Sequence, residues 1–345
     1  MPISFILQCL FYDRPRRMQK LKLLMHSEDQ LLNYIDQLDN NDPFKTIAKD
    51  RFLTLGQVVA QMKAFKIHWL DSTHTLFPAS VLELPDPPMG LFYLGDIQSL
   101  SAELIGVVGT RRPSITAHAR VESILAEFYG LSTISGGALG IDALVHQFSL
   151  EFNVPTIAVL ASGLDQLTPR TNARLFKKLI DSGRGCIISE CPPGVLPKPY
   201  FFPQRNRLIA VLSTKLIVIE AAKRSGAVLT ANLAAGFGKD VGALVSGYGA
   251  QQSEGCYELM NDGAYVIGNR KMLHDFLGTQ MKQNGKDGLD ETNQLLSMIP
   301  VEPIHIEDLA LRLAMPLNKL IEHVTALSLN EDVVVFSGQM VRRNA

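Results

Sequence analysis

The sequence has few cysteines, few aromatic residues and almost no net charge. Its 345 residues include four cysteines, and 33 basic residues are balanced by 34 acidic ones, giving a formal net charge of -1. Because no two cysteines form a CxxC pair, the sequence favours reduced structural thiols over a zinc knuckle. The balanced charge means that any anion-binding site must come from a local cluster of basic residues.

Long apolar runs and a secretory signal are also missing. No run approaches the roughly 20 apolar residues that span a bilayer. The apolar stretch 1–10 precedes Arg14, Arg16 and Arg17, which is the reverse of the order in a signal peptide. We therefore expect a cytoplasmic protein that makes no membrane contact.

From residue 105 onward, short apolar runs alternate with helical stretches. The runs expected to form strands are 105–108, 131–135, 156–160, 186–189, 215–220, 241–245 and 264–267. Strands that are apolar throughout and alternate with helices are typical of a parallel sheet covered on both faces. The sequence therefore predicts an α/β fold with a doubly wound, mostly parallel sheet.

The regions on either side of this pattern predict smaller domains. Residues 1–75 have helical spacing, and 76–104 form a connector that leads into the sheet domain at 105–270. A polar linker at 271–288 follows. The last segment, 289–345, predicts three helices at 291–298, 306–314 and 317–329, then a hairpin that turns at Ser337-Gly338. Three helices and a hairpin indicate a winged helix.

Small, hydroxylated and basic residues follow the predicted strands, at the edge where an open parallel sheet binds ligands. They are Gly109, Thr110 and Arg111 after the first strand, Ser135, Gly136, Gly137 and Gly140 after the second, Phe201, Phe202, Arg205, Asn206 and Arg207 after the fourth, and Lys223, Arg224, Ser225 and Gly226 after the fifth. Glycine-rich loops and guanidinium groups hold phosphates, and phenyl rings stack on bases. This set predicts a site for single-stranded nucleic acid.

Taken singly, the loops leave other interpretations open. The loop 135–142 also fits a tight turn that binds nothing, or a dinucleotide site in which Ser135 replaces the first glycine. One of Phe201 and Phe202 could belong to the core. Either Arg205 or Arg207 could form an internal salt bridge.

Catalytic interpretations rest on isolated residues. His146 could act as a base, and Ser135 as a nucleophile, although the G-x-S-x-G elbow is incomplete. A magnesium site would use Asp142, Asp165 and Glu190. No Cys/His cluster or HExxH motif indicates a catalytic metal, so we expect neither a metal nor another cofactor.

Taken together, the loops resemble the DNA-processing protein A family (DprA, also called Smf). The matching segments are 107–111, 135–143 with His146, 188–194, 202–210, 220–226, 255–256 and 262–264. The resemblance implies an extended Rossmann-like domain that forms homodimers and binds single-stranded DNA. It also implies a non-enzymatic protein that helps load a RecA-type recombinase during natural transformation. The helices of 1–75 resemble the family's sterile-alpha-motif-like domain, and 289–345 its winged helix.

The sequence departs from the family pattern at three places. The family commonly has Arg or Lys at the position of Leu139, so one phosphate contact is expected to be missing. The segment Leu167-Thr168-Pro169 and the residue Ser246 also differ from the family's usual residues.

Two rival functions stay open at this point. One is a nucleotide-processing enzyme on the same sheet, resembling a phosphoribohydrolase. The other is an adaptor that acts through the winged helix. Its predicted third helix carries only Lys319 and His323 as cations and also contains the acidic Glu322. So few cations favour partner binding over the reading of duplex DNA.

Overall fold

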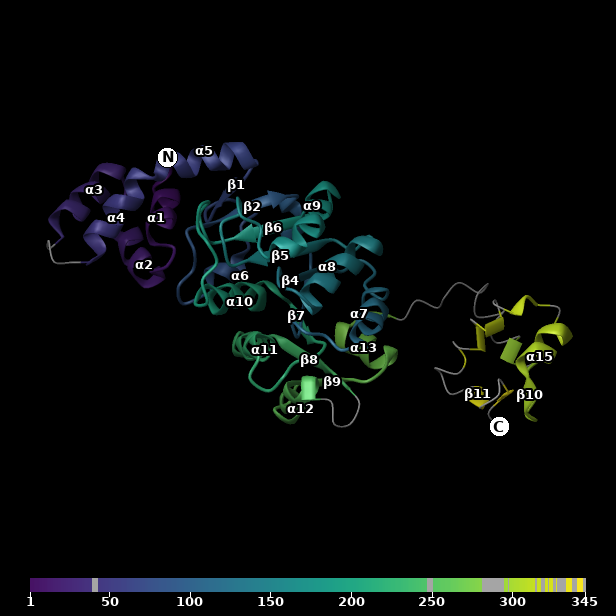
Figure 1. Ribbon diagram of the computed structural model, residues 1–345. Helices are drawn as coiled ribbons and strands as arrows, with labels where there is room; N and C mark the ends of the chain where they lie inside the picture. Colours follow the sequence, from purple (N-terminus) through teal and green to yellow (C-terminus); the bar gives the residue numbers. More distant parts are fainter. Residues whose placement is uncertain are drawn as a thin grey trace. The chain divides into compact units, whose positions relative to one another are not determined.

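The computed structural model describes residues 1–38, 43–246 and 251–280, and within 295–343 all positions except 297, 314, 318–319, 322, 325–326, 328–332 and 337–339. The chain divides into two compact units, Met1–Thr279 and Gln280–Ala345 (Figure 1). Each unit has its own hydrophobic core, and each is described by itself below.

A nine-stranded sheet forms the centre of the first unit, in the order β1-β2-β6-β5-β4-β3-β7-β8-β9. Its parallel strands are β3 (Leu104–Val108), β4 (Ser132–Gly136), β5 (Thr156–Leu160), β6 (Gly185–Ser189), β7 (Lys215–Val218), β8 (Asp240–Leu244) and β9 (Tyr265–Ile267). β1 (His68–Asp71) and β2 (Gly90–Gly95) join antiparallel at one side. The predicted mostly parallel sheet is confirmed.

The strand order reverses at the centre of this sheet. From β3, the chain builds β4, β5 and β6 outward on one side, and then returns to place β7, β8 and β9 on the other. The neighbours β3 and β7 pair in parallel, with Val108 opposite Val218. In open α/β sheets, the crevice outside the carboxyl ends at such a switch point is the usual ligand site.

Helices cover both faces of the sheet, as the apolar strands require (Figure 1). One face carries α6 (Ala79–Leu82), α10 (Phe201–Leu212), α11 (Gly226–Gly236) and α12 (Glu254–Asn261). The other carries α7 (Ala117–Leu125), α8 (Ile141–Glu151) and α13 (Arg270–Leu277). Leu104 and Val108 of β3 face the first layer and Ile105 and Val107 the second, because successive side chains alternate across a strand.

Five helices precede the sheet: α1 (Ile3–Phe11), α2 (Pro15–Leu24), α3 (Glu28–Gln37), α4 (Pro43–Leu53) and α5 (Leu55–Phe65). They share a hydrophobic cluster with β2 and with α9 (Ala173–Asp181). This region is helical up to Phe65 and then forms strand β1 of the sheet. These helices belong to the same compact unit as the sheet, and both the domain boundary near residue 75 and the likeness to a sterile alpha motif stay predictions.

The second unit contains β10 (Ile304–His305), α15 (Ile306–Arg312), β11 (Val333–Phe336) and β12 (Met340–Arg343), with its strands in the order β10-β12-β11. Residues Leu295 and Leu320 are helical and lie in the core of this unit. The predicted turn at Ser337-Gly338, Lys319, Glu322 and residues 281–288 of the predicted linker lie outside the described residues, whereas the first part of that linker is helix α13. The winged helix therefore stays a prediction.

The described part of the chain holds no helix long and apolar enough to cross a bilayer. All four cysteines are buried and free, and burial raises the pKa of each thiol. Their burial confirms the prediction of structural thiols.

Candidate functional site

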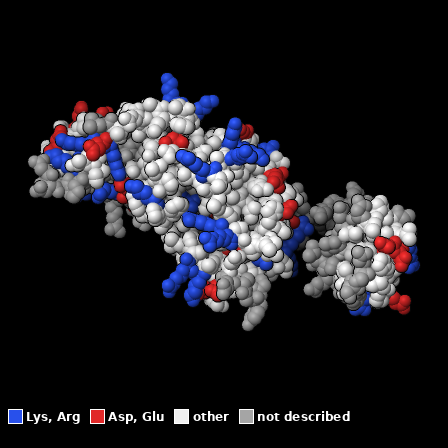
Figure 2. Space-filling view, viewed as in Figure 1, with Lys and Arg blue, Asp and Glu red and all other residues white. Residues whose placement is uncertain are grey.

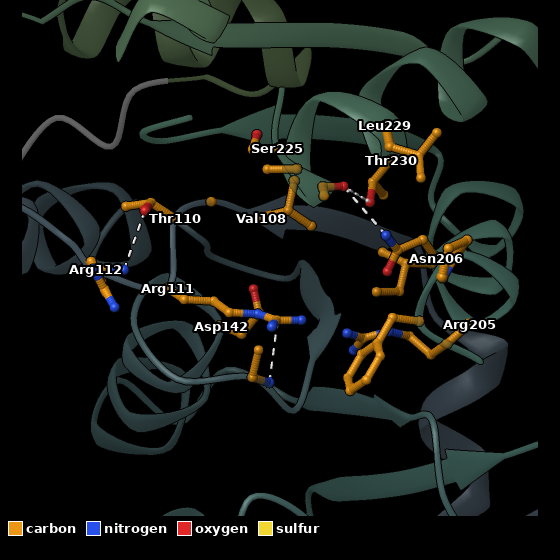
Figure 3. Close-up of a pocket in the computed structure, with 17 residues that line it drawn as sticks. Val108, Thr110, Arg111, Arg112, Asp142, Arg205, Asn206, Ser225, Leu229 and Thr230 are labelled. Atoms are coloured by element: carbon orange, nitrogen blue, oxygen red, sulfur yellow. Dashed lines mark hydrogen bonds between the residues drawn. The ribbon is translucent and has the colours of Figure 1, made fainter. Parts of the chain in front are cut away.

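A crevice of about 450 Å³ lies outside the carboxyl ends of β3 and β7, at the switch point of the sheet. The loop after β3, the start of α8, one face of α10 and the start of α11 line it (Figure 3). The lining residues are Val108, Gly109, Thr110, Arg111, Arg112, Ala138, Asp142, Phe202, Pro203, Arg205, Asn206, Ile209, Ser225, Gly226, Ala227, Leu229 and Thr230. The sheet therefore brings most of the predicted loops to one place.

Helix α10 begins at Phe201, whereas the sequence pattern predicts a helix that starts near Arg205, four residues later. The helical period then separates neighbouring residues onto different faces. Phe202, Asn206 and Ile209, spaced by four and three, line the crevice. Phe201 turns into the core.

Arg111 and Phe202 contact each other in the crevice. The guanidinium of Arg111 lies 5.0 Å from the centre of the Phe202 ring, in a cation–π contact. Arg111 is exposed, and its side chain extends into the crevice toward Arg205 (Figure 3). This pair combines a phosphate-binding group with an aromatic surface.

Arg205 forms the floor of the crevice beneath this pair. It is buried, and its Nη1 donates to the carbonyl oxygen of Val159 at 2.8 Å. Its Nε has no hydrogen-bond partner among the described residues. Burial lowers the pKa of this guanidinium, and the nearby carboxylate of Asp142 opposes that shift. The guanidinium fills the space where a Cβ at Gly136 would lie, 1.9 Å from Nη1.

Asp142 is the acidic group of the crevice. Its Oδ2 accepts from the backbone N–H of Ala138 at 3.3 Å, at the entrance to α8. Burial raises the pKa of the Asp142 carboxyl, while Arg205 and, more weakly, Arg111 lower it. Because Arg111, Arg112 and Arg205 line the crevice together with one carboxylate, the crevice favours an anionic ligand.

The N-terminus of α11 closes the opposite side of the crevice. Ser225 caps this helix, since its hydroxyl accepts from the N–H of Val228 at 3.3 Å. Gly226 and Ala227 follow in the first turn and line the crevice. The N–H groups and dipole of a helix N-terminus attract anions.

A buried glutamate fixes the loop that carries Arg111. Glu220 is 2% exposed, and one of its carboxylate oxygens accepts from the backbone N–H of Ser114 at 2.9 Å. Its other oxygen accepts from the Ser114 hydroxyl and lies 3.4 Å from Nη1 of Arg120. The carbonyl of Glu220 also accepts from Thr110 N at 2.7 Å. Glu220 therefore holds the β3–α7 loop at both ends of its basic segment.

The glycine-rich loop after β4 is packed more tightly than a phosphate cradle requires. Ser135 is fully buried and donates to the carbonyl of Val107 at 2.7 Å. Gly136 and Gly137 are also buried, and Gly140 has φ +80 with Thr110 O 2.3 Å from where a Cβ would lie. Glycine is needed here for close packing. None of these four residues lines the crevice, and their part in DNA binding stays a prediction.

Two predicted residues of α10, Phe201 and Arg207, lie away from the crevice. Phe201 is 2% exposed and packs against Tyr12 and Tyr200, so its ring has no open face for a base. Arg207 is bound internally, because its guanidinium reaches Glu190 at 2.5 Å and Asp86 at 3.2 Å.

Lys223 and Arg224, which follow β7, are also absent from the residues that line the crevice. Lys223 forms a salt bridge with Glu258, and Arg224 is exposed. The part of Lys223 and Arg224 in DNA binding therefore stays a prediction.

The sequence prediction missed Arg112, Ala138, Leu229 and Thr230, which line the crevice. Arg112 adjoins Arg111, and Leu229 and Thr230 lie one turn beyond Gly226, so helical spacing from the cap could have indicated them.

The residues considered for catalysis are held internally. His146 is buried, with Nε2 at 2.9 Å from Gly136 O and Nδ1 at 2.8 Å from the Thr156 hydroxyl. Burial lowers the pKa of His146 to about 4. Asp165 accepts from the N–H of Gly194 at 2.8 Å, and Glu190 pairs with Arg207. In the described ranges no group of three acidic, His or Cys residues is placed to hold a metal.

The fold and the crevice define an α/β protein with a crevice lined by arginines at the switch point of its parallel sheet. A family model described as DNA recombination-mediator protein A matches residues 68–278, and the chain belongs to this family. The matched residues contain every residue that lines the crevice and all nine strands of the sheet.

Relatives support this assignment. The chain is 38% identical over 211 residues to Protein Smf of Synechocystis sp., covering 59% of this chain and 52% of that protein. It is 35% identical over 192 residues to the DNA processing protein DprA of Streptococcus pneumoniae, covering 55% and 67%. The chain thus spans about half the length of the first of these relatives.

Two solved structures are similar. DNA processing protein A from Streptococcus pneumoniae matches with a TM-score of 0.60 and 30% identity, over 67% of this chain and 81% of that one. DNA processing protein A from Helicobacter pylori, whose structure concerns its single-stranded DNA binding mode, matches with a TM-score of 0.56 and 28% identity, over 62% and 97%.

Proposed function

We propose that this chain binds single-stranded DNA in the crevice between β3 and β7 and acts as a recombination mediator. The observation that carries the proposal is the meeting of Arg111, the Phe202 ring and the N-terminus of α11 on one crevice. Cationic and aromatic groups side by side are the usual chemistry of sequence-tolerant single-strand binding. The relative from Helicobacter pylori binds single-stranded DNA, which supports the same ligand here.

The roles of the groups follow from their exposure. Arg111 is exposed and can contact two phosphate oxygens at once, as a guanidinium does with planar anions. The N–H groups at the start of α11 supply further donors. Phe202 provides a ring on which a base can stack. Asn206 lines the crevice and adds a polar contact.

We further propose that the bound strand is passed to a RecA-type recombinase in natural transformation, and that the chain forms a homodimer through its sheet domain. Both proposals follow from membership of the family. An assay of recombinase loading on single-stranded DNA that is coated with this protein tests the transfer. Sedimentation of the full chain tests the homodimer.

Anisotropy of a labelled oligonucleotide under salt titration tests the site. If Z phosphates are held, log affinity should fall with log salt with a slope of about −0.7Z for a single strand. Arg111→Ala should weaken binding and make this slope shallower by about 0.7. Lys239→Ala is the matched control, because Lys239 precedes β8 at the opposite edge of the sheet. Equal binding by both variants would refute the site.

The rival nucleotide-processing function uses a glutamate at this edge of the sheet. Glu220 is engaged by Ser114 and Glu190 by Arg207, so both carboxylates already serve the fold. Incubation with nucleoside monophosphates tests the rival, and release of free base would favour it over the binding function.

A further inference from the structure

Two more hollows continue from the crevice along the surface of the first unit. The first, of about 310 Å³, shares Arg111, Ala138, Phe202 and Arg205 with the crevice. Its remaining lining is mostly apolar, including Leu139, Pro169 and Pro197. The second, of about 720 Å³, shares Thr168 with the first. We call them the apolar hollow and the outer hollow.

The outer hollow lies between the end of α5 and the helix α9. The end of α5 contributes Phe65, and the residues that follow it contribute Lys66 and His68. The loop after β5 and the helical turn that leads into α9 contribute Thr168 and Arg170, and α9 itself contributes Lys177. Three segments that are distant in sequence thus bring cations and an aromatic ring to one hollow.

The cations of this hollow are more numerous than its acids. Lys66, Arg170 and Lys177 line it together with Asp165 and Asp181. Asp165 already accepts from Gly194 N at 2.8 Å. Within the described ranges, no salt bridge involves Lys66, Arg170 or Lys177. Their charges are therefore available to an anionic ligand.

Helix α9 extends this positive surface. Arg174 and Lys178 are exposed on the same helix, beside the row formed by Arg170 and Lys177. Figure 2 shows basic side chains gathered on the surface over α9. Arg170 lies in the 3-10 turn that leads into α9, and Lys177 lies further along in α9 itself. Cations spread along consecutive turns suit a chain of phosphates better than one small anion.

An exposed aromatic ring accompanies these cations. Phe65 is 52% exposed, although a phenylalanine is usually buried. Beside it, the ring of His68 stacks on Tyr93, with centroids 5.1 Å apart. Aromatic faces interleaved with basic side chains repeat the composition of the crevice itself.

We propose that the outer hollow is a second subsite for single-stranded nucleic acid, where Arg170 and Lys177 hold phosphates and Phe65 stacks a base. A strand that leaves the crevice crosses the apolar hollow, whose Leu139 carries no charge, and regains phosphate contacts along α9. This inference rests on the proposed function of the crevice. It predicts that affinity depends on strand length.

The test compares oligothymidylates of two lengths, about five and about twenty nucleotides, since single-strand sites span roughly 4–16 nucleotides. The double variant Arg170→Ala/Lys177→Ala should bind the long strand about tenfold less tightly and lower its salt slope by about 1.4. Its affinity for the short strand should not change. The double variant Lys239→Ala/Lys271→Ala removes the same charge from the β8–β9 half of the sheet and should match the native protein with both strands.

Phe65 variants separate stacking from charge. Phe65→Leu keeps an apolar side chain and should weaken long-strand binding about fivefold, and Phe65→Trp should restore it, because only the aromatic residues stack. The half-exposed position makes misfolding a poor explanation for a loss, and a thermal melt checks that.

The outcomes separate this subsite from the crevice. Arg111→Ala should weaken binding of both strands, whereas Arg170→Ala/Lys177→Ala should weaken binding of the long strand alone. If Arg170→Ala/Lys177→Ala and its control bind the long strand equally, the second subsite is overturned and the crevice stands. If the native protein binds neither strand, the proposed function itself fails, and the subsite with it.

Discussion

Two adjacent phenylalanines on α10 should respond to truncation in opposite ways. Phe201 is 2% exposed and lies with its ring centre 4.4 Å from Tyr200 and 5.7 Å from Tyr12. Removing a buried phenyl ring costs about 3–5 kcal/mol of folding free energy. For a unit of this size, that loss corresponds to roughly 6–20 °C in Tm. The Phe201→Ala variant should therefore unfold at a lower temperature than the native protein, yet its folded fraction should bind DNA with normal affinity.

Phe202 faces the crevice instead. It lines the crevice and contacts the guanidinium of Arg111. Its truncation should cost about 1–3 kcal/mol of binding for the lost base, or about 5- to 150-fold in affinity. Because Phe202 is only partly buried, Tm should fall by no more than a few degrees. Phe202→Leu should behave like Phe202→Ala in binding, since leucine fills space without stacking.

The assay pairs a thermal melt with oligonucleotide anisotropy at a temperature where both variants are folded. The reasoning is refuted if Phe202→Ala binds as tightly as the native protein. It is equally refuted if Phe201→Ala melts normally but binds weakly, because that result would place its ring at the ligand and not in the core.

Three further results are expected. Arg207→Ala should lower the free energy of unfolding by about 3–5 kcal/mol in urea, because it leaves Glu190 buried without its partner, whereas DNA affinity at low denaturant should hold. Burial lowers the pKa of His146 from 6.5 to about 4, so, as the pH falls, His146 becomes protonated in the unfolded chain before it does in the folded one. The free energy of unfolding should therefore keep its full value above pH 6.5 and fall by about 1.4 kcal/mol per pH unit down to pH 4. Urea unfolding across this range should show the slope in the native protein and lose it in His146→Gln. Ending the chain after Thr279 keeps the whole first unit, so crevice binding by anisotropy should persist, and a large loss of affinity would place part of the site in residues 280–345.

The seven parallel strands of the sheet could be predicted because each is a short and mostly apolar run, whereas β1 lies in the region that the sequence predicts as helical. Their placement followed from the chain alternating between such runs and helices. Ligand loops after the first and fifth predicted strands were found for the same reason, since all carboxyl ends of parallel strands meet at one edge. Thr110 and Gly226 lie at the crevice as that rule requires.

The start of α10 could not be read from the sequence because Pro203 and its neighbours resemble a loop. Proline is tolerated in the first turn of a helix, where its missing N–H has no partner to lose. Because the helix starts four residues earlier, it sets the direction in which each side chain from Phe201 to Arg207 points. It turns Phe202 to the ligand, Phe201 to the core and Arg207 toward Asp86, a partner 121 residues away in the chain.

The absence of a cation at Leu139 makes sense once the buried arginine is considered. Leu139 is 44% exposed and borders the apolar hollow, so it neither holds the fold together nor contributes charge. Arg205 is buried beside Asp142, which offsets part of its charge. The exposed guanidinium groups of Arg111 and Arg112 then carry most of the crevice's attraction for phosphate. A site with so few cations gains little from a short strand, and a longer strand that reaches α9 recovers the contacts that Leu139 cannot make.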